Sequence, residues 1–440
     1  MIPQVNKYLI YYPVQFLRRE WPRSFLKDFK KVERFSKQEI ANYQLICINQ
    51  LIKYVNKYVP FYNGLKTKTL HNIRNLDEIQ ELPILTKRDI MKVIGDLESQ
   101  ESFLIHSYRG TSGTTGEPFG FFKDRLATSA MEAAMYTAYS RYGIELGDRQ
   151  ARIWGSKIHL KDRIVQVVKD FVLNRRRLSA FNMSEETCIR YYNLLKSFKP
   201  KYIYAYPNAL YRFIQVLCDA GISPRGLNIA HVICTGEILF DYQRQLIENE
   251  LGAHVINEYG TTENGIAAFE CYNHNLHMLS QTILLEIIRP DGSRAKFEEE
   301  GEVVITELFS RSIPFIRYKT GDKATLSDDS CKCGLQMPIL KGISGRIDDF
   351  IMRRDGQLVY DAILAYTLKS YARQFKAIQT DFENLIIYVV PVNDFSTETE
   401  RSICVDLRKY LGNDMGIQFI HADKIEAESS GKFRYFVRKI

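Results

Sequence analysis

The stretch Gly110-Thr111-Ser112-Gly113-Thr114-Thr115-Gly116 contains only glycine, serine and threonine, and Glu117-Pro118 follows it directly. Glycines allow the backbone to approach a ligand closely and to turn its N–H groups inward, and the hydroxyls add further donors. A triphosphate site requires these properties, although a flexible polar surface loop could have the same composition. The candidate phosphate-binding residues are Thr111, Ser112, Gly113, Thr114, Thr115 and Gly116.

Standard phosphate-binding and nucleophile motifs are absent elsewhere in the chain. It has no Gly-Lys-Ser/Thr of a Walker loop, no Gly-x-Gly-x-x-Gly after a strand and no Gly-x-Ser-x-Gly elbow. The glycine-rich stretch must therefore belong to another architecture.

Length and composition indicate a globular protein of two or three domains, because 440 residues exceed one ordinary core. No apolar run approaches the ~18 residues that span a bilayer. Charges interrupt every apolar stretch near the N-terminus, so we expect no signal peptide and a cytoplasmic protein. Eight cysteines do not form a dense disulfide framework, and we expect them to be reduced.

The net charge of +8 is modest, and no nucleic-acid-binding signature accompanies it. We expect short basic runs such as 175–177 to be solvated. Residues 8–21 mix aromatic and basic side chains. Packing on the main body is one interpretation of that segment, and peripheral contact with an anionic membrane surface is the other.

Hydrophobic periodicity predicts an α/β domain followed by a small α+β domain. A helical spacing covers residues 37–59 and ends at Pro60. Short apolar runs predict buried strands at 202–205, 232–234 and 255–256, and alternation predicts a half-buried strand at 301–306.

After residue 345 the pattern changes to a candidate helix, strand, helix and strand, at 361–375, 385–390, 396–411 and 417–420. We therefore expect an N-terminal domain at 1–347 and a C-terminal domain at 348–440.

Four further polar segments accompany the glycine-rich stretch. Residues 257–263 and 317–322 each follow an apolar strand, 345–349 open the C-terminal domain, and 430–434 nearly end the chain. Each motif is weak alone, but their order and spacing together are specific.

In this order, the chain resembles the adenylate-forming superfamily, specifically phenylacetate–coenzyme A ligases and their CapK-type relatives. The resemblance covers nearly the whole chain, from Val59-Pro60-Phe61-Tyr62 and the segment 82–87 to Lys432. It implies a large domain of mixed sheets and helices with a small mobile α+β domain. It also implies ATP-dependent activation of a carboxylic acid to an acyl-adenylate, with acyl transfer to a thiol or amine.

The resemblance assigns roles to the polar segments. It places the β- and γ-phosphates at the glycine-rich loop, Mg²⁺ at Glu263, adenine on Tyr259 and the ribose hydroxyls on Asp322. Lys432 would neutralise the α-phosphate and the attacking carboxylate. Further implied nucleotide-site residues are Glu237, Gly260, Thr262 and Arg317, with Arg346 as a catalytic residue and Asp348 as the hinge.

Simpler interpretations exist for each residue alone. Glu263 and Asp322 could be cap or turn residues, and Lys432 could be a surface lysine. The chain also departs from many superfamily members, which carry a lysine after the loop proline where this chain has Phe119.

We expect the acyl site at strand ends, where α/β sheets open a crevice. The candidate segments are 154–156, 206–208 and 234–237. Their aromatics favour a planar or apolar acid, although core packing explains them equally well.

Two cysteine-containing segments predict a structural Zn²⁺ site. Cys271 and His277 form one short pair, and Cys331 and Cys333 form the other. Three thiolates and an imidazole suit tetrahedral zinc, and CapK-type relatives commonly show a similar arrangement. His274 could replace His277, and the alternative is four unrelated reduced side chains.

The leading functional hypothesis is an acid–coenzyme A ligase that uses ATP and Mg²⁺. The same adenylation could instead lead to an amide on an amino-sugar or amine in surface-polysaccharide synthesis, or to AMP transfer to a cofactor. A non-catalytic nucleotide-binding protein is the hypothesis from another class.

Overall fold

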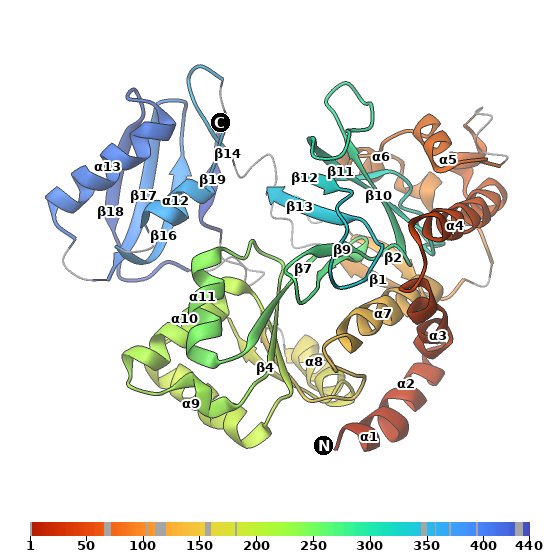
Figure 1. Cartoon of the computed structure of the whole chain (residues 1–440), viewed down its shortest axis with the longest axis horizontal. Helices are drawn as coiled ribbons and strands as arrows, with labels where there is room; N and C mark the ends of the chain where they lie inside the picture. Colours follow the sequence, from red (N-terminus) through yellow and green to blue (C-terminus); the bar gives the residue numbers. More distant parts are fainter. Residues whose placement is uncertain are drawn as a thin grey trace. The chain divides into compact units, whose positions relative to one another are not determined.

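The computed structural model describes residues 2–65, 72–102, 104–110, 120–154, 160–180, 183–344, 350–356, 358–368, 371–392, 395–426 and 434–440. The chain forms two compact units, Met1–Ile343 and Ser344–Ile440 (Figure 1). The predicted hinge, Asp348, lies outside the described residues. None of the described helices combines the length and apolarity needed to cross a bilayer.

Helices occupy most of the first hundred residues. They are α1 (Pro3–Val5), the π-helix η1 (Asn6–Tyr11), α2 (Tyr12–Leu17), α3 (Pro22–Val32), α4 (Lys37–Tyr58), α5 (Pro60–Asn63), the 3-10 helix η3 (Leu76–Glu81) and α6 (Lys87–Leu97). The predicted helix at 37–59 is confirmed. A capping box of Ser36 and Glu39 begins it, and Pro60 starts the next helix.

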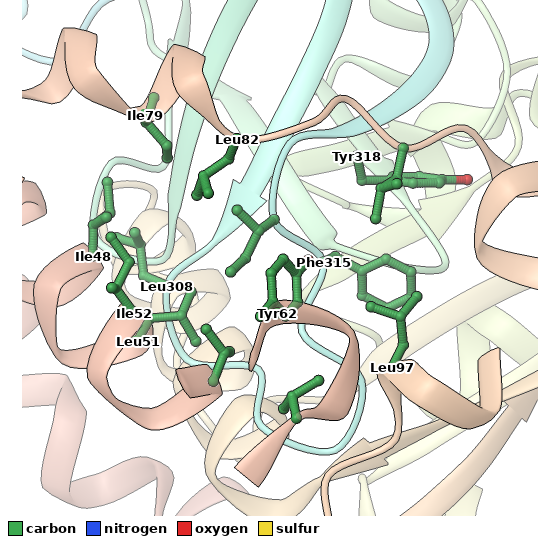
Figure 2. Close-up of a cluster of buried hydrophobic side chains, with 14 of the residues drawn as sticks. Ile48, Leu51, Ile52, Tyr62, Ile79, Leu82, Leu97, Leu308, Phe315 and Tyr318 are labelled. Atoms are coloured by element: carbon green, nitrogen blue, oxygen red, sulfur yellow. The ribbon is translucent and has the colours of Figure 1, made fainter. Parts of the chain in front are cut away.

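The apolar face of α4 forms one core of the large unit. Figure 2 shows Ile48, Leu51 and Ile52 of α4 gathered with Tyr62 and Leu308, and all of these side chains are buried. Leu308 lies more than two hundred residues away in sequence, so this core joins the N-terminal helices to the later strands.

In the described part of the chain, thirteen strands precede the small unit's own sheets. They are β1 (His106–Gly110), β2 (Gly120–Asp124), β3 (Gln150–Trp154), β4 (Arg175–Ser179), β5 (Tyr202–Ala205), β6 (His231–Thr235), β7 (His254–Thr261), β8 (Gly265–Glu270), β9 (Leu276–Met278), β10 (Ile283–Ile288), β11 (Glu300–Glu307), β12 (Tyr318–Ser327) and β13 (Ile339–Ser344). The strands β1 and β2 form a separate antiparallel pair, and the other eleven form one sheet in the order β10-β11-β12-β13-β9-β8-β7-β6-β5-β3-β4.

The parallel half of this sheet runs from β4 to β7 and is covered on both faces. Its helices are α7 (Arg125–Ser140), α8 (Leu160–Val172), α9 (Glu185–Phe198), α10 (Pro207–Asp219), the 3-10 helix η4 (Pro224–Leu227) and α11 (Asp241–Leu251). Along β6, Val232 and Cys234 pack with α9 to α11, whereas Ile233 packs with Ala134 of α7. Burial on both faces explains the continuous apolar runs of the inner strands β5, β6 and β7.

The small unit is an α+β fold, as expected. It contains β14 (Phe350–Met352), β15 (Leu358–Tyr360), α12 (Ala362–Leu368), β16 (Ala372–Gln379), β17 (Asn384–Pro391), α13 (Thr397–Leu411), β18 (Gly416–His421) and β19 (Phe436–Arg438). Four strands form a sheet in the order β18-β17-β16-β19. The buried Gln379 of β16 bonds both backbone groups of Met352, which holds the β14–β15 pair to this sheet.

Two expectations were wrong. The helix predicted at 361–375 ends at Leu368, and residues from Ala372 form β16, where burial alternates with a period of two. The basic run 175–177 is not solvated throughout, because Arg175 and Arg177 of β4 both pair with Asp170 of α8.

The N-terminal helices are attached to α7 through polar groups. The Gln15 side chain donates to Glu132 Oε2 at 3.3 Å, and the Trp21 backbone donates to Ser129 Oγ at 2.8 Å. Burial raises the pKa of Glu132 to about 7, against the opposing hydrogen bond from Tyr11. In this pH range the folded state therefore retains a proton that the unfolded state has released.

We expect Glu132→Gln to stabilise the protein at about pH 8 by on the order of 1–3 kcal/mol, and by less at about pH 5. The reason is that the unfolding free energy falls as pH rises from 4.5 to about 7 while Glu132 is present. Thermal unfolding at both pH values measures this difference. Glu145→Gln is the control, because Lys7 donates to Glu145 and lowers its pKa. Removing this carboxylate should lower the stability at about pH 8, whereas Glu132→Gln should raise it. An equal gain at both pH values would contradict the assignment.

Candidate active site

The parallel strands reverse their order between β3 and β5. From β3 the chain passes outward to β4, and from β5 it continues in the other direction to β6 and β7. Ligands of open α/β sheets bind at such a switch point, outside the carboxyl ends of the strands. Trp154 ends β3 and Tyr206 follows β5, and their rings stack at 3.8 Å between centroids. The structure therefore brings two of the predicted acyl-site segments together at this edge.

The third predicted acyl-site segment joins the same edge. Glu237 Oε2 accepts hydrogen bonds from the side chain of Asn208 at 2.8 Å and from its backbone at 3.3 Å. Gly236 has a φ of +80°, and a Cβ there would lie 3.1 Å from the Tyr206 ring. Glycine is therefore needed for the backbone to approach this ring. Two members of the first segment, Gly155 and Ser156, lie outside the described residues.

The hairpin between β7 and β8 carries the predicted magnesium residue. Its turn is closed by a hydrogen bond from the Asn264 backbone to Thr261 Oγ1 at 3.0 Å, which leaves Thr262 exposed and Glu263 buried. A Cβ on Gly260 would lie 2.4 Å from the Gly265 carbonyl oxygen. The backbone approach within the hairpin thus explains Gly260 without any ligand.

Contacts from two remote strands fix the position of Glu263. The Tyr318 hydroxyl of β12 donates to Glu263 Oε1 at 3.1 Å, and Lys123 Nζ of β2 donates to the Glu263 carbonyl oxygen at 2.6 Å. Lys123 also forms an ion pair with Glu307 at the end of β11, and both side chains are fully buried. Burial lowers the pKa of Lys123 and raises that of Glu307, whereas each partner's charge opposes the shift.

Tyr259 and Asp322 meet although three strands separate β7 from β12 in the sheet order. The Tyr259 hydroxyl donates to Asp322 Oδ2 at 2.6 Å. In a flat sheet four spacings of about 4.8 Å would separate β7 from β12, which is farther than a tyrosine side chain can reach. The antiparallel half of the sheet must therefore curl to allow this contact. The structure therefore brings together the residues predicted to bind adenine and ribose.

Arg317 does not face these residues. Its guanidinium group pairs with Glu286 of β10 and donates to the carbonyl oxygens of Gln80 and Leu82 at 2.9 and 2.7 Å, and its side chain is buried. The backbone beside it pairs with Leu85. Its assignment as a nucleotide-site residue is therefore corrected: it holds the segment 80–85 against the sheet.

Several predicted site residues fall outside the described residues. They are Thr111, Ser112, Gly113, Thr114, Thr115, Gly116, Arg346, Asp348 and Lys432. The strands on either side of the glycine-rich stretch pair as far as Gly110 and Gly120. In the small unit, the first described residues after Lys432 lead into β19, where Phe436 is buried beside Ala377.

The four predicted zinc ligands gather in one place. The ligand atoms of Cys271, His277, Cys331 and Cys333 all lie within 4.8 Å of one another. Cys271 Sγ is 3.6 Å from Cys331 Sγ, and Cys333 Sγ is 3.2 Å from His277 Nε2. Zn–S bonds of about 2.3 Å in a tetrahedron place two sulfurs about 3.8 Å apart, so the donor set fits this metal.

Neighbouring groups orient these donors. His277 Nδ1 lies 2.9 Å from the Met337 carbonyl oxygen, so Nδ1–H can donate there and leave the Nε2 lone pair facing the cysteines. Burial raises the pKa of Cys331, but hydrogen bonds from the Cys333 backbone and from Asn275 outweigh it and lower the pKa to about 6. His274 is not a member of this cluster, because it lies beside Glu270 and Arg244.

The sequence analysis did not single out Lys123, and it assigned no role to Tyr318 or Glu258 within their polar segments. Glu258 lies on the opposite face of β7 from Tyr259 and accepts hydrogen bonds from Tyr139 and Tyr204, each at 2.8 Å. Burial raises the pKa of Glu258, against these two donors. The position of Glu258 in an apolar strand was the available signal, since a buried carboxyl group requires partners.

We expect Lys123→Met to destabilise the protein by about 3–5 kcal/mol, because it leaves Glu307 buried without its counter-charge. The double variant Lys123→Met/Glu307→Leu should recover most of this loss. Thermal and urea unfolding of the three proteins measure the effect. Lys341→Met is the matched control, since its ion pairs are exposed and their loss should change stability far less. A double variant no more stable than Lys123→Met would refute this explanation.

Comparisons with known proteins cover nearly the whole chain. A family model described as the CapK C-terminal domain matches residues 351–439. Protein CapK of Staphylococcus aureus is 23% identical over 437 residues, which cover 97% of this chain and 94% of that protein. The phenylacetate-coenzyme A ligase of Thermus thermophilus is 23% identical over 424 residues, which cover 90% of this chain and 88% of that protein.

A solved structure shows the same fold. It is that of 2-hydroxyisobutyryl-CoA ligase in the postadenylation state in complex with R3-HIB-AMP, with a TM-score of 0.77 and 20% identity, covering 93% of this chain and 91% of that chain. The chain is therefore similar to CapK and to phenylacetate-coenzyme A ligases over nearly its whole length, and it shares the fold of the solved 2-hydroxyisobutyryl-CoA ligase.

Proposed function

We propose that this protein activates a carboxylic acid with ATP to an acyl-adenylate and pyrophosphate, and then transfers the acyl group to coenzyme A. The observation that carries the proposal is the convergence of Tyr259, Asp322 and Glu263 from separate segments. The contacts Tyr259–Asp322 and Tyr318–Glu263 join the end of β7 and its hairpin to the beginning of β12. The relatives named as coenzyme A ligases and the adenylate-bound neighbour support the same reaction.

The proposed first step joins a carboxylate oxygen to the α-phosphorus while the bond to pyrophosphate breaks. Both reactants are anions, so positioning and charge neutralisation must lower the barrier. Glu263 would hold Mg²⁺, which supplies positive charge for the phosphate oxygens when bound. Residues 111–116 would donate to the β- and γ-phosphates, and Lys432 would neutralise the α-phosphate and the attacking carboxylate.

The nucleoside would be recognised between β7 and β12. Tyr259 would pack on adenine, and the Asp322 carboxylate, which accepts the Tyr259 hydroxyl, would also accept the ribose hydroxyls. Arg346 and the hinge residue Asp348 would allow the small unit to deliver Lys432 for adenylation and to withdraw it for acyl transfer. This arrangement would separate the two half-reactions in time.

The acid would bind beside the stacked rings of Trp154 and Tyr206. The Arg152 guanidinium lies 4.6 Å from the ring centroids of both Trp154 and Tyr204, which holds the wall of aromatic rings in place. A planar or apolar acid is therefore the first class to include in a substrate panel.

A second candidate keeps the adenylation and changes the acceptor to an amine, such as that of an amino-sugar. The match of residues 351–439 to the CapK C-terminal domain is the reason to test it, because this match sets the chain beside CapK as well as beside the coenzyme A ligases. Adding coenzyme A or a panel of amines to the adenylation reaction distinguishes the two candidates by which one consumes the adenylate.

We expect pyrophosphate release from ATP with at least one aromatic or short apolar acid in such a panel. Lys432→Ala should lower this rate by roughly 10²–10⁴-fold while ATP binding is retained, because the lysine acts mainly on the transition state. Lys439→Ala is the matched control, since Lys439 is an exposed cation of the same tail and should change the rate less than about twofold. Undiminished release by Lys432→Ala would contradict its role, and no release with any acid would contradict the proposed function.

We also propose that Cys271, His277, Cys331 and Cys333 hold a structural Zn²⁺. The fit of four donor atoms within 4.8 Å of one another supports this proposal. The cluster would link the end of β8 and the strand β9 to the loop before β13, and so stabilise the curled half of the sheet.

We expect about one zinc per chain in protein purified without chelators. Cys271→Ser and Cys331→Ser should each lose most of the metal and lower the unfolding temperature, because closed structural sites contribute directly to folding. Cys218→Ser is the control, since this exposed thiol of α10 lies outside the cluster. Elemental analysis and thermal unfolding give the answer, and well under one zinc per chain in the wild type would exclude the site.

A further inference from the structure

The outermost N-terminal helices expose several large apolar side chains and bury two polar ones. In η1 and α2, Asn6 and Gln15 are buried against the large unit. In contrast, Leu9, Phe16 and Leu17 are 71%, 62% and 80% exposed. A helix that packs on a core normally turns its large apolar side chains inward, so these three exposed side chains require an explanation.

Helix α8 has an exposed face of the same kind. Ile164, Val168 and Phe171 follow each other at helical spacing, and each is 58–59% exposed. Val165 and Val167, beside them, are 67% exposed. A single exposed apolar residue needs no explanation, but a contiguous apolar face marks an interaction surface.

The two apolar faces belong to one region of the large unit. The Asn6 side chain of η1 donates to the Val172 carbonyl oxygen at the end of α8, at 3.1 Å. Figure 1 shows α8 beside the N-terminal helices. We call this region, formed by residues 2–21 and 164–171, the apolar face.

Positive charge and interfacial aromatics border the apolar face. Residues 2–27 contain five basic side chains, three of them Arg18, Arg19 and Arg23, and one acidic side chain, Glu20. Glu20 is buried and paired with Arg18 and Arg125, so its charge is already neutralised. Trp21, half exposed, contacts Phe16 edge to face at 5.2 Å.

We propose that the apolar face binds the surface of an anionic membrane. Exposed Leu, Phe and Val side chains would enter the interface, Trp21 would lie at the headgroup level, and the arginines would contact anionic headgroups. A second copy of this chain on the same face would bring the two positive rims together, which disfavours self-association. The proposal does not depend on the adenylation chemistry.

Co-sedimentation of the full chain with vesicles tests this proposal. Binding to vesicles of phosphatidylcholine with phosphatidylglycerol should exceed binding to phosphatidylcholine alone and should weaken as salt rises. Leu9→Ser/Leu17→Ser and Val168→Ser/Phe171→Ser should each lower the binding at least tenfold. The control Ile46→Ser/Val405→Ser removes two equally exposed apolar side chains elsewhere, at 59% each, and should bind like the wild type.

Arg19→Glu/Arg23→Glu is an independent variant that leaves the apolar side chains intact. It should abolish the preference for anionic vesicles while thermal unfolding remains unchanged. Equal binding to both kinds of vesicle, or none, would overturn the proposal. A wild-type dimer that Leu9→Ser/Leu17→Ser converts to a monomer, without vesicle binding, would assign the face to a second copy of the chain instead.

Discussion

The buried ammonium group of Lys123 joins three segments that are far apart in sequence. It lies on β2, pairs with Glu307 of β11 and donates to the carbonyl oxygen of Glu263 in the β7–β8 hairpin. A charge this deeply buried is tolerated only with a counter-charge and further hydrogen bonds, so the three segments must assemble together. The same ammonium group therefore fixes the position of the β7–β8 hairpin, and with it Glu263, relative to β2.

The two halves of the large sheet supply different residues of the candidate site. The parallel half supplies strand ends and a change of direction between β3 and β5, where Trp154 and Tyr206 stack. The antiparallel half curls so that β12 reaches β7, which gives the contact between Tyr259 and Asp322. The Cys/His cluster lies in the antiparallel half, among the loops and strands that must curl.

Arg317 and Lys123 show how buried charges serve the fold in this protein. Both are enclosed cations paired with a carboxylate from another strand, and both use their remaining donors on backbone carbonyl oxygens. Arg317 connects the segment 80–85 to β10, and Lys123 connects β2 to the hairpin of Glu263. The outer N-terminal helices differ, because there Asn6 and Gln15 are buried whereas Leu9, Phe16 and Leu17 are exposed.

Local elements and the grouping of motifs could be predicted from the sequence. Helical spacing and Pro60 predicted α4, continuous apolar runs predicted β5 to β7, and short Cys/His spacings predicted the cluster. These features depend on periodicity and on residues close together in the chain, so they can be recognised without coordinates.

Which remote residues come into contact depends on the fold and could not be predicted from local patterns. Arg317 pairs with Glu286, and Lys123 donates to the carbonyl oxygen of Glu263. Gly260 is required because Gly265 approaches it closely. The end of the helix predicted at 361–375 belongs to β16 instead, and Leu9 and Leu17 lie on the surface. Each of these results depends on strand pairing or on burial between segments separated by many residues, and no local pattern encodes such contacts.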